Sequence, residues 1–298
     1  MIVAIASGKG GTGKTSLAVN LARTLERTLS LPVQLLDCDV EEPNAHLFLA
    51  GTPLGEETIN IAVPDFDPDK CDACDKCVEF CQFNALASVG KTPLLFPELC
   101  HGCGGCFEVC APAALNRGQR ELGSLQWGRW NLNPAREQAL LMGKSRVGEA
   151  MSPPLLRALE RAFASAACEG VTDGPDILID SPPGVSCPAM TTARMADALV
   201  LVAESTPFGM YDFKLAHAAF KKLGLSLAVV MNRAGMPGNE AGDAALERYC
   251  AAEGLPLLAR LPFDMQAAEG YARGNLPPLG PGDNGRAWRG RFESLQQA

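Results

Sequence analysis

The sequence feature that most constrains the fold is a glycine-rich loop near the N-terminus. It reads SGKGGTGKTS over residues 7–16 and follows the apolar segment MIVAIA. Beyond the loop, Leu17, Leu21 and Leu25 recur at helical spacing and predict a helix. A strand, a GxxxxGKT loop and a helix in this order predict a phosphate-binding P-loop rather than a glycine-rich structural turn.

The residue types of this loop suit a bound nucleotide. Backbone N–H groups of such a loop surround phosphate oxygens, and the N-terminus of the following helix adds partial positive charge. In this motif the lysine, here Lys14, reaches the outer phosphates, and the hydroxyl of Thr15 binds Mg²⁺. The predicted nucleotide-binding residues of the loop are Gly8, Gly10, Gly11, Thr12, Gly13, Lys14, Thr15 and Ser16.

Further apolar segments predict the rest of a sheet. They are PVQLLDCD, PDILIDSPPG, ALVLVAES, LSLAVVMN and PLLARLP, and a helix-like segment, PPLLRALERAFASAA, lies among them. Strands rich in Val, Ile and Leu that alternate with helices indicate a parallel sheet buried on both faces. We expect an α/β fold with a doubly wound, mostly parallel sheet of the P-loop NTPase class, and a ligand at the carboxyl ends of the strands. We also expect RELGSLQWGRWNLN to form a β-hairpin that returns the chain to the sheet.

Eight cysteines form two runs of the pattern CxxCxxCxxxC. The first run is Cys71, Cys74, Cys77 and Cys81, and the second is Cys100, Cys103, Cys106 and Cys110. This is the spacing of bacterial ferredoxins, in which three close cysteines hold one [4Fe–4S] cluster and the fourth crosses to the other. We therefore assign Cys71, Cys74, Cys77 and Cys110 to one cluster, and Cys100, Cys103, Cys106 and Cys81 to the second. Zinc is the competing metal, but zinc ribbons use two separated CxxC pairs.

The cysteine runs lie in a segment without the rhythm of the sheet. Residues 64–115 show neither strand nor helix periodicity, so we expect a small bacterial-ferredoxin-like α+β domain folded around metal. The predicted division is 1–60 for the first part of the P-loop domain, 61–117 for the inserted two-cluster domain, and 118–298 for the second part of the P-loop domain.

Composition and charge exclude some classes of function. The chain of 298 residues has a formal net charge of −8 and a pI of about 5.0, whereas nucleic-acid binding depends on clustered Lys and Arg. No apolar run approaches the roughly 18 residues that span a bilayer, and the N-terminus lacks the regions of a signal peptide. We expect a cytoplasmic protein, in which 12 cysteines favour metal or redox chemistry over a disulfide scaffold.

Lys9 is a second lysine in the loop, and phosphate binding does not require it. With this lysine, KGGTGKTS resembles the deviant Walker loop of the MinD, Mrp and nitrogenase iron protein superfamily. The resemblance implies that Lys9 crosses a dimer interface and stabilises charge at the partner's phosphates, as an arginine finger does. The alternative is a solvated lysine at the tip of a loop.

The resemblance extends to later strand ends. In LLDCDVEEPN, Asp37 and Asp39 match the family's acidic strand end, where Asp39 is expected to act on the attacking water or the Mg²⁺ shell. Asp180 matches the Walker B aspartate, Gly184 the glycine that senses the γ-phosphate, and Asn232 the asparagine that reads the adenine. An aspartate after an apolar strand is also a common helix cap. The resemblance implies ATP hydrolysis with ATP, Mg²⁺ and two [4Fe–4S] clusters as cofactors, and its catalytic residues are Lys9, Lys14, Asp39 and Asp180.

The combination of loop and cysteines suggests a gated electron carrier. The insertion follows VEEPN, a segment that switches with the γ-phosphate in this superfamily. We therefore expect nucleotide-driven dimer switching to control electron transfer through the clusters to a redox partner or metal-cluster protein. The first alternative is an Mrp-type ATPase that assembles or carries iron–sulfur clusters, with Cys187 of PPGVSCP as a labile ligand at a dimer interface. The other interpretation of Cys187 is a structural thiol.

The second alternative is a MinD-like positioning ATPase with a redox-sensing insert. The C-terminal segment RAWRGRFESLQQA places Trp288, Phe292 and Leu295 at helical spacing, enough for a weak amphipathic helix. Because this segment is short and ends in polar residues, we expect it to pack on the core, and we expect no membrane contact. The expected partner within an ATP-dependent dimer is a second copy of the chain or a related ATPase.

Overall fold

The computed structural model describes residues 1–29, 33–49, 51–133, 136–149, 151–167 and 176–276. The described chain divides into two compact units. The first unit comprises Met1–Glu56, Leu125–Lys144 and the described residues from Leu156 onward, and the second comprises Glu57–Ser124 and Ser145–Leu155. The domain boundaries that we expect from the sequence stay a prediction.

A nine-stranded sheet organises the described residues, in the order β11-β10-β9-β1-β8-β2-β7-β6-β3. Along the chain the strands are β1 (Ile2–Ala6), β2 (Val33–Asp37), β3 (Gly51–Phe66), β6 (Leu115–Asn133), β7 (Arg136–Ser145), β8 (Asp176–Asp180), β9 (Ala198–Glu204), β10 (Ser226–Ala234) and β11 (Leu257–Pro262). The pairs that join β11, β10, β9, β1, β8, β2 and β7 are all parallel. The mostly parallel sheet expected from the apolar segments is confirmed.

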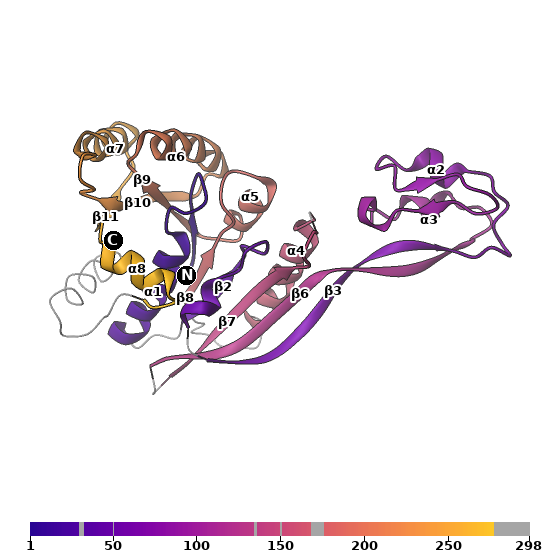
Figure 1. Ribbon diagram of the computed structural model, residues 1–298, viewed down its shortest axis with the longest axis horizontal. Coiled ribbons are helices and arrows are strands. Elements are labelled where there is room, and N and C mark those ends of the chain that lie inside the picture. Colours follow the sequence, from indigo (N-terminus) through magenta and orange to yellow (C-terminus); the bar gives the residue numbers. More distant parts are fainter. Residues whose placement is uncertain (30–32, 50, 134–135, 150, 168–175, 277–298) are drawn as a thin grey trace. The chain divides into compact units, whose positions relative to one another are not determined.

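Helices flank the sheet of the first unit. They are α1 (Lys14–Leu29), α4 (Pro153–Ala167), α5 (Cys187–Ala193), α6 (Pro207–Phe220), α7 (Glu240–Glu253) and α8 (Met265–Ala272). In Figure 1, α6 and α7 lie on one side of β9–β11, and α1 and α8 lie on the other. The helix expected to start at Pro153 is confirmed as α4, because a proline in the first turn lacks only an N–H that has no partner there.

The core of the first unit lies between α1 and the strands. Leu17, Leu21 and Leu25 of α1 are at most 8% exposed, so the apolar face predicted for this helix is confirmed. Burying each leucine contributes about 2 kcal/mol. Their cluster includes strand residues Ile5, Val33, Leu35 and Leu178. This packing fixes the N-terminus of α1, and the loop before it, against the ends of the strands.

The carboxyl ends of three strands meet beside the glycine-rich loop. In the parallel register, Asp37 at the end of β2 is opposite Asp180 at the end of β8, and Asp180 is also opposite Ile5 of β1. The loop that follows β1 therefore begins at the level of both aspartates. This is the edge at which an open α/β sheet binds its ligands.

The second unit contains short elements around the cysteine runs. They are α2 (Lys76–Phe80), β4 (Leu86–Ala87), β5 (Leu94–Leu95) and α3 (Gly105–Val109). β4 and β5 form a small antiparallel pair, and α2 packs against α3. A Cβ on Gly105 of α3 would lie 2.1 Å from the ring of Phe80 in α2, so this glycine permits the close contact between the two helices.

The expectation of a hairpin over residues 120–133 was wrong. These residues lie within the single strand β6, in which Leu122 and Leu125 are buried. The strand includes Gly123 and Gly128, which a strand accommodates at some cost in stability. The strand β3, of 16 residues, was not expected either, and the alternating Ile59, Ile61 and Val63 were its signal.

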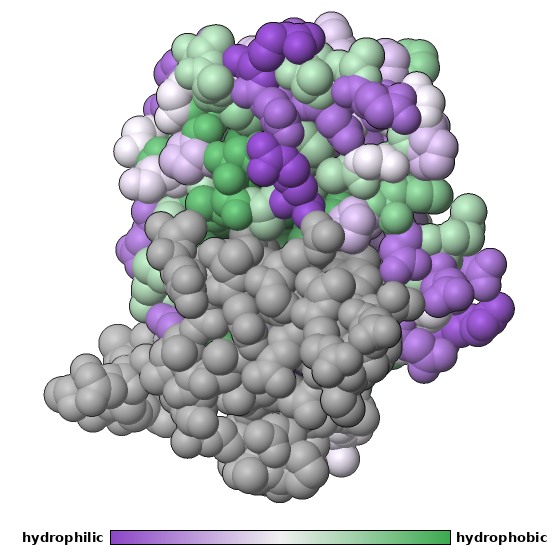
Figure 2. Space-filling model, turned by 90° about the vertical axis from the view of Figure 1, so that its left-hand side faces the viewer, coloured by the Kyte–Doolittle hydropathy of each residue, from purple (hydrophilic) through white to green (hydrophobic). Residues whose placement is uncertain are grey.

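None of the described helices combines the length and the apolar character that crossing a bilayer requires. On the face that Figure 2 shows, hydrophilic and hydrophobic residues are interspersed over the coloured surface.

Candidate functional site

The glycine-rich loop connects β1 to α1, and two of its glycines are required by the packing around them. A Cβ on Gly8 would lie 2.2 Å from the backbone oxygen of Asp212 in α6. Gly13 has a φ of +98°, and a Cβ there would lie 2.3 Å from Nδ2 of Asn232. Because no larger residue fits at either position, the loop backbone is held directly between α6 and the end of β10.

Lys14 and Thr15 begin α1 beside the buried carboxylate of Asp180. The hydroxyl of Thr15 donates a hydrogen bond to Oδ2 of Asp180, and Lys14 is only 6% exposed. Among the described residues, Oδ1 of Asp180 is buried and has no hydrogen-bond partner. A carboxylate oxygen without a partner, next to a hydroxyl, offers the oxygen ligands that Mg²⁺ prefers. Thr15 and Asp180 are therefore suitable ligands for the Mg²⁺ ion that accompanies a bound nucleotide.

Burial raises the pKa of Asp180 to about 7, while Lys14 and the hydrogen bond from Thr15 act in the opposite direction. An aspartate in the unfolded chain has a pKa of about 4, so between about pH 4 and pH 7 the folded protein binds the proton more tightly than the unfolded chain does. The stability that this group contributes is therefore fully present below about pH 4 and is lost as the pH rises through about 7.

We expect this titration to be measurable in the protein without nucleotide and Mg²⁺. The free energy of unfolding of the wild type, relative to that of an Asp180→Asn variant, should fall as the pH rises from about 4 to about 7. Urea denaturation of both proteins at several pH values measures the difference, and asparagine serves as the residue that cannot ionise. A difference that stays constant with pH would contradict the raised pKa.

Asp37 and Asp39 take different positions at the end of β2. Asp37 is fully buried, and its carboxylate accepts hydrogen bonds from the N–H groups of Asp39, Asn44 and Ala45 at 3.0–3.1 Å. Burial raises the pKa of Asp37, and the neighbouring Asp180 raises it further. Asp39 is half-buried and lines the same cavity as Lys14. Asp37 thus shapes the segment after β2, and Asp39 is the aspartate that a ligand in the cavity can reach.

A cavity of about 380 Å³ lies in front of the loop, a volume within the range of small-molecule sites. Its predicted lining residues include Gly10, Gly11, Gly13, Lys14, Thr15, Ser16, Asp39 and Asn232. Sequence reasoning missed the lining from β11 and α8, which consists of Leu261, Pro262, Phe263, Asp264, Ala267, Ala268 and Tyr271. The available signal was Asp264, which follows a strand end and caps α8 by accepting the N–H groups of Gln266 and Ala267.

Asn232 at the end of β10 closes against the glycine-rich loop. Its Nδ2 donates to the carbonyl oxygen of Thr12 at 2.7 Å, and its Oδ1 accepts the N–H of Arg233 at 3.0 Å. The guanidinium of Arg233 donates to the carbonyl oxygen of Gly11 at 3.0 Å. Each end of a side-chain amide can make a second hydrogen bond, so Asn232 keeps the capacity to bind a base. Its adenine-reading role stays a prediction.

Lys9 lies in an ion pair within the chain. Its ammonium is 3.1 Å from one carboxylate oxygen of Glu204 at the end of β9, and the other oxygen of Glu204 is 3.0 Å from the guanidinium of Arg233. The side chain of Lys9 is 31% exposed and that of Glu204 is 8% exposed, so within one chain Lys9 is paired with a mostly buried carboxylate. Sequence reasoning missed Glu204, although an acidic residue at the end of ALVLVAE was the available signal.

Gly184 lies in the loop after β8 and contacts the start of the glycine-rich loop. It has a φ of +81°, a conformation that favours glycine. Its N–H donates to the carbonyl oxygen of Ser7 at 3.0 Å. The residue singled out in the sequence therefore lies next to the loop, and its role toward the γ-phosphate stays a prediction.

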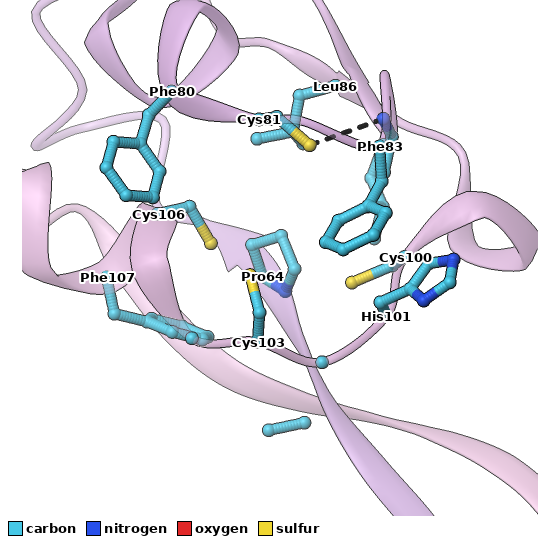
Figure 3. Close-up of a pocket in the computed structure, with 15 residues that line it drawn as sticks. Pro64, Phe80, Cys81, Phe83, Leu86, Cys100, His101, Cys103, Cys106 and Phe107 are labelled. Carbon is cyan, nitrogen blue, oxygen red and sulfur yellow. Dashed lines mark hydrogen bonds between the residues drawn. The ribbon is translucent and has the colours of Figure 1, made fainter. Parts of the chain in front are cut away.

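Four cysteines of the second unit line one pocket. They are Cys81, Cys100, Cys103 and Cys106, and the other lining residues are mainly apolar. In Figure 3, the sulfur atoms of Cys100, Cys103 and Cys106 point toward a common hollow, which Cys81, the residue after α2, also borders. This set combines the fourth cysteine of the first run with the three close cysteines of the second. It has the same membership as the second predicted cluster.

In each predicted group of four cysteines, neighbouring thiols raise the pKa of one member. Burial, together with the neighbouring Cys100 and Cys103, raises the pKa of Cys106 to about 11. Burial likewise raises the pKa of Cys77, and Cys110 and Cys71 add to that effect. Thiols that are close together and partly buried resist ionisation unless a metal binds them, because a metal ion deprotonates a coordinating thiol outright.

The two runs fold into the same local backbone. Ala73 and Asp75 in the first run and Gly102 and Gly104 in the second have positive φ values of 55, 56, 61 and 80°. For a residue with a side chain this conformation costs about 1–2 kcal/mol, and it persists only where the surrounding structure requires it. The loops between the cysteines are therefore held in a definite shape.

The fourth cysteine of each run accepts a backbone hydrogen bond. The N–H of Ala85 donates to Sγ of Cys81 at 3.4 Å, and the N–H of Ala114 donates to Sγ of Cys110 at 3.3 Å. Such N–H···S bonds are among the features that tune the potential of iron–sulfur clusters.

In the described residues, no group of three or more His, Cys, Asp or Glu side chains is arranged to hold a metal ion.

The remaining cysteines are separate from these groups. Cys187 is exposed and is the first residue of α5, whereas Cys38 and Cys250 are buried. Cys168 lies outside the described residues, as does the C-terminal segment with Trp288, Phe292 and Leu295.

Comparison with known proteins agrees with the fold. The family profile described as CobQ/CobB/MinD/ParA nucleotide binding domain matches residues 3–278. The chain is 27% identical over 285 residues to an uncharacterized protein of Methanocaldococcus jannaschii, covering 92% of this chain and 90% of that protein. It is 23% identical over 278 residues to an iron–sulfur cluster carrier protein of Pyrococcus abyssi, covering 90% of this chain and 75% of the relative.

A solved structure shows the same architecture. The septum site-determining protein MinD of Pyrococcus horikoshii, in complex with Mg-ADP, matches with a TM-score of 0.53 and 22% sequence identity. The match covers 99% of this chain and 93% of that chain. Similarity at this level shows the fold, and it confirms the predicted doubly wound α/β sheet.

Proposed function

This chain belongs to the CobQ/CobB/MinD/ParA nucleotide-binding family of P-loop ATPases, and we propose that it couples ATP hydrolysis to electron transfer through two [4Fe–4S] clusters. The observation that carries the proposal is the pocket that Cys81, Cys100, Cys103 and Cys106 line together. The protein would act in the cytoplasm as an ATP-dependent dimer of two such chains, or with a related ATPase, and deliver electrons to a redox partner or metal-cluster protein.

The nucleotide half of the mechanism uses the residues around the cavity. Backbone N–H groups of the loop and the ammonium of Lys14 would bind the phosphates, and the oxygens of Thr15 and Asp180 would hold Mg²⁺. Mg²⁺ neutralises charge on the phosphates when it is bound. Asp39, which lines the cavity, orients the attacking water or the water shell of the cation. Lys9 of a second chain stabilises the charge that develops during transfer.

The cluster half uses the two groups of thiols. Cys71, Cys74, Cys77 and Cys110 would hold one cluster, and Cys81, Cys100, Cys103 and Cys106 the other. The clusters supply one-electron transfer when bound. The apolar lining of the pocket, with Phe80, Phe83 and Phe107, limits the access of water to the second cluster.

The segment after β2 supplies the coupling between the two halves. Asp39 at its start lines the nucleotide cavity, and the ring of Phe48 at its end stacks on Tyr271, another lining residue, at a centroid distance of 4.0 Å. The chain then continues into β3, which leads into the second unit. A ligand in the cavity therefore contacts the start of this segment directly and its end through Tyr271. A change at the γ-phosphate can move this segment.

Lys9 can act on a second chain only after it leaves Glu204, so removing the charge of Glu204 should favour the dimer. We expect a Glu204→Gln variant to raise the affinity of the ATP-dependent dimer about threefold, since partly exposed ion pairs contribute little. Analytical ultracentrifugation with a slowly hydrolysed ATP analogue measures the change. Glu253→Gln, which breaks the exposed Lys221–Glu253 pair, is the matched control and should have no effect. A dimer of unchanged or lower affinity for Glu204→Gln would contradict the idea that the ion pair with Glu204 keeps Lys9 away from the second chain.

The first alternative, an assembly or carrier ATPase, also has support. The relative from Pyrococcus abyssi is named an iron–sulfur cluster carrier protein. Cys187 is exposed beside the loop that contains Gly184, as a ligand for a transferred cluster would be. In this function the eight cysteines of the second unit keep their own clusters, and the cargo cluster binds at Cys187.

EPR spectroscopy tests the proposed function and separates it from the alternatives. The protein is purified anaerobically, reduced with dithionite, and measured alone, with Mg-ATP and with Mg-ADP. Two [4Fe–4S] signals whose shape or midpoint potential changes with the nucleotide are expected. Clusters that are present but indifferent to nucleotide would contradict the coupling and favour the carrier or a positioning ATPase with a redox-sensing insert. An iron-free protein with full ATPase activity would remove the cluster half of the proposal.

A further inference from the structure

A buried ion pair in the second unit lies next to the second cysteine run. Arg120 of β6 and Glu149 of the turn after β7 form a salt bridge, and their side chains are only 6% and 4% exposed. Nη2 of the same guanidinium donates to the carbonyl oxygen of Cys100 at 3.1 Å. Burying two charges is costly unless their geometry is well defined. The pair therefore keeps one positive and one negative charge at fixed positions next to the loop that contains Cys100.

The turn that carries Glu149 is tied to the same strand as Arg120. The N–H of Arg146 donates to the carbonyl oxygen of Leu122 in β6 at 2.8 Å. The N–H of Glu149 donates to the carbonyl oxygen of Arg146 at 3.0 Å, and a carboxylate oxygen of Glu149 accepts the N–H of Met151 at 2.9 Å. Because strand and turn are linked in this way, the guanidinium is kept between the carboxylate and the backbone of Cys100.

The first cysteine run lacks this arrangement. Among the described residues, the carbonyl oxygen of Cys71, the counterpart of Cys100, receives no hydrogen bond from a charged side chain. The two runs otherwise share their spacing, their left-handed residues and their N–H···S bonds. The ion pair is thus a difference in charge between two otherwise similar sites.

We propose that Arg120 is a positioning residue that raises the reduction potential of the cluster held by Cys81, Cys100, Cys103 and Cys106, and that Glu149 limits this increase. The inference rests on the proposed function, because it requires that cluster to be bound. Reduction adds one negative charge to a cluster. A fixed positive charge nearby stabilises the reduced form, and a fixed negative charge destabilises it. The ion pair thereby gives the two clusters different potentials.

Single variants of the two residues should shift the potential in opposite directions. In the full-length, anaerobically purified protein, Arg120→Gln is expected to lower the ratio of reduced to oxidised second cluster about tenfold at a fixed potential, which is about 59 mV for a one-electron couple. Glu149→Gln is expected to raise that ratio by a similar factor. Redox titration followed by EPR measures both, and the potential of the first cluster should change less.

Further variants separate this role from a purely structural one. Each single variant leaves one buried charge without its partner, so iron content and thermal unfolding are measured alongside the potential. The double variant Arg120→Gln/Glu149→Gln removes both charges and should return the potential toward that of the wild type. Arg120→Lys keeps the positive charge and should show a smaller shift than Arg120→Gln. Arg146→Gln, at an exposed position on the same turn, is the control and should leave the potential unchanged.

The outcomes distinguish this inference from the proposed function. Opposite shifts of the single variants, with cancellation in the double variant, support it. Shifts in the same direction, or no shift in proteins that retain both clusters, would overturn the role of Arg120 and leave the proposed function intact. A wild-type protein that binds no cluster would overturn both.

Discussion

A Cys74→Ala/Cys81→Ala double variant is expected to lose both clusters, because the crossed assignment places these two cysteines in different clusters. A Cys81→Ala/Cys103→Ala variant instead removes two ligands of one cluster. About four of the roughly eight irons of two [4Fe–4S] clusters should then remain in each chain. Assays of iron and acid-labile sulfide on anaerobically purified proteins measure the difference.

The control for this experiment is a Cys187→Ala/Cys250→Ala variant, which removes one exposed and one buried thiol outside the two runs. Its iron content should equal that of the wild type. The reverse pattern, in which Cys74→Ala/Cys81→Ala retains about four irons and Cys81→Ala/Cys103→Ala retains none, would mean that each run holds its own cluster. Iron-free protein with bound zinc and no sulfide would exclude both assignments.

A Lys9→Ala variant is expected to hydrolyse ATP about a thousandfold more slowly and to bind ATP almost as well as the wild type. Lys9 pairs with Glu204 in the single chain and does not line the nucleotide cavity, so its loss removes little binding energy. Its effect arises in the transition state, where a cation from the second chain meets the charge on the transferred phosphoryl group. Steady-state hydrolysis and equilibrium titration with ATP measure the two quantities separately.

Two comparisons define the role of Lys9. Lys14→Ala should weaken both binding and hydrolysis, because Lys14 lines the cavity, and Lys222→Ala should change neither, because that side chain is exposed.

In an equal mixture of two variants, a Lys9→Ala chain keeps an intact cavity and an Asp39→Ala chain keeps its Lys9. Partial recovery of hydrolysis in the mixture is expected if Lys9 acts on the partner. An inactive mixture would place the action of Lys9 within its own chain.

Local sequence patterns predicted most of the first unit. The apolar strands and the leucines of α1 are signals that repeat over short distances, and each segment carries enough of the pattern to be recognised alone. The hairpin expected over residues 120–133 failed because glycine is common both in turns and in strands, and only the pairing partners distinguish the two. For β3, the alternation of Ile59, Ile61 and Val63 was present, but it covers only the second half of the strand and follows glycine and charged residues.

The candidate site likewise contains some residues that the sequence predicted and others that only the fold reveals. The loop pattern predicted Lys14 and Thr15, the family resemblance implied Asp39, Asp180 and Asn232, and the structure brings all five to one region. The spacing did not predict the cavity residues of β11 and α8, because they follow the loop by more than 240 residues and share no local pattern with it.

The sequence by itself determined the phosphate loop with the strand before it and the helix after it, and the two cysteine runs, because each of these depends on residues that are close together in the chain. The tertiary structure alone decided which distant side chains meet. It pairs Lys9 with Glu204, places Cys81 in a pocket with the second run, and sets Arg120 between Glu149 and the backbone of Cys100. Ion pairs and shared pockets form wherever the fold brings complementary groups together, and such contacts between distant residues leave no local pattern in the sequence.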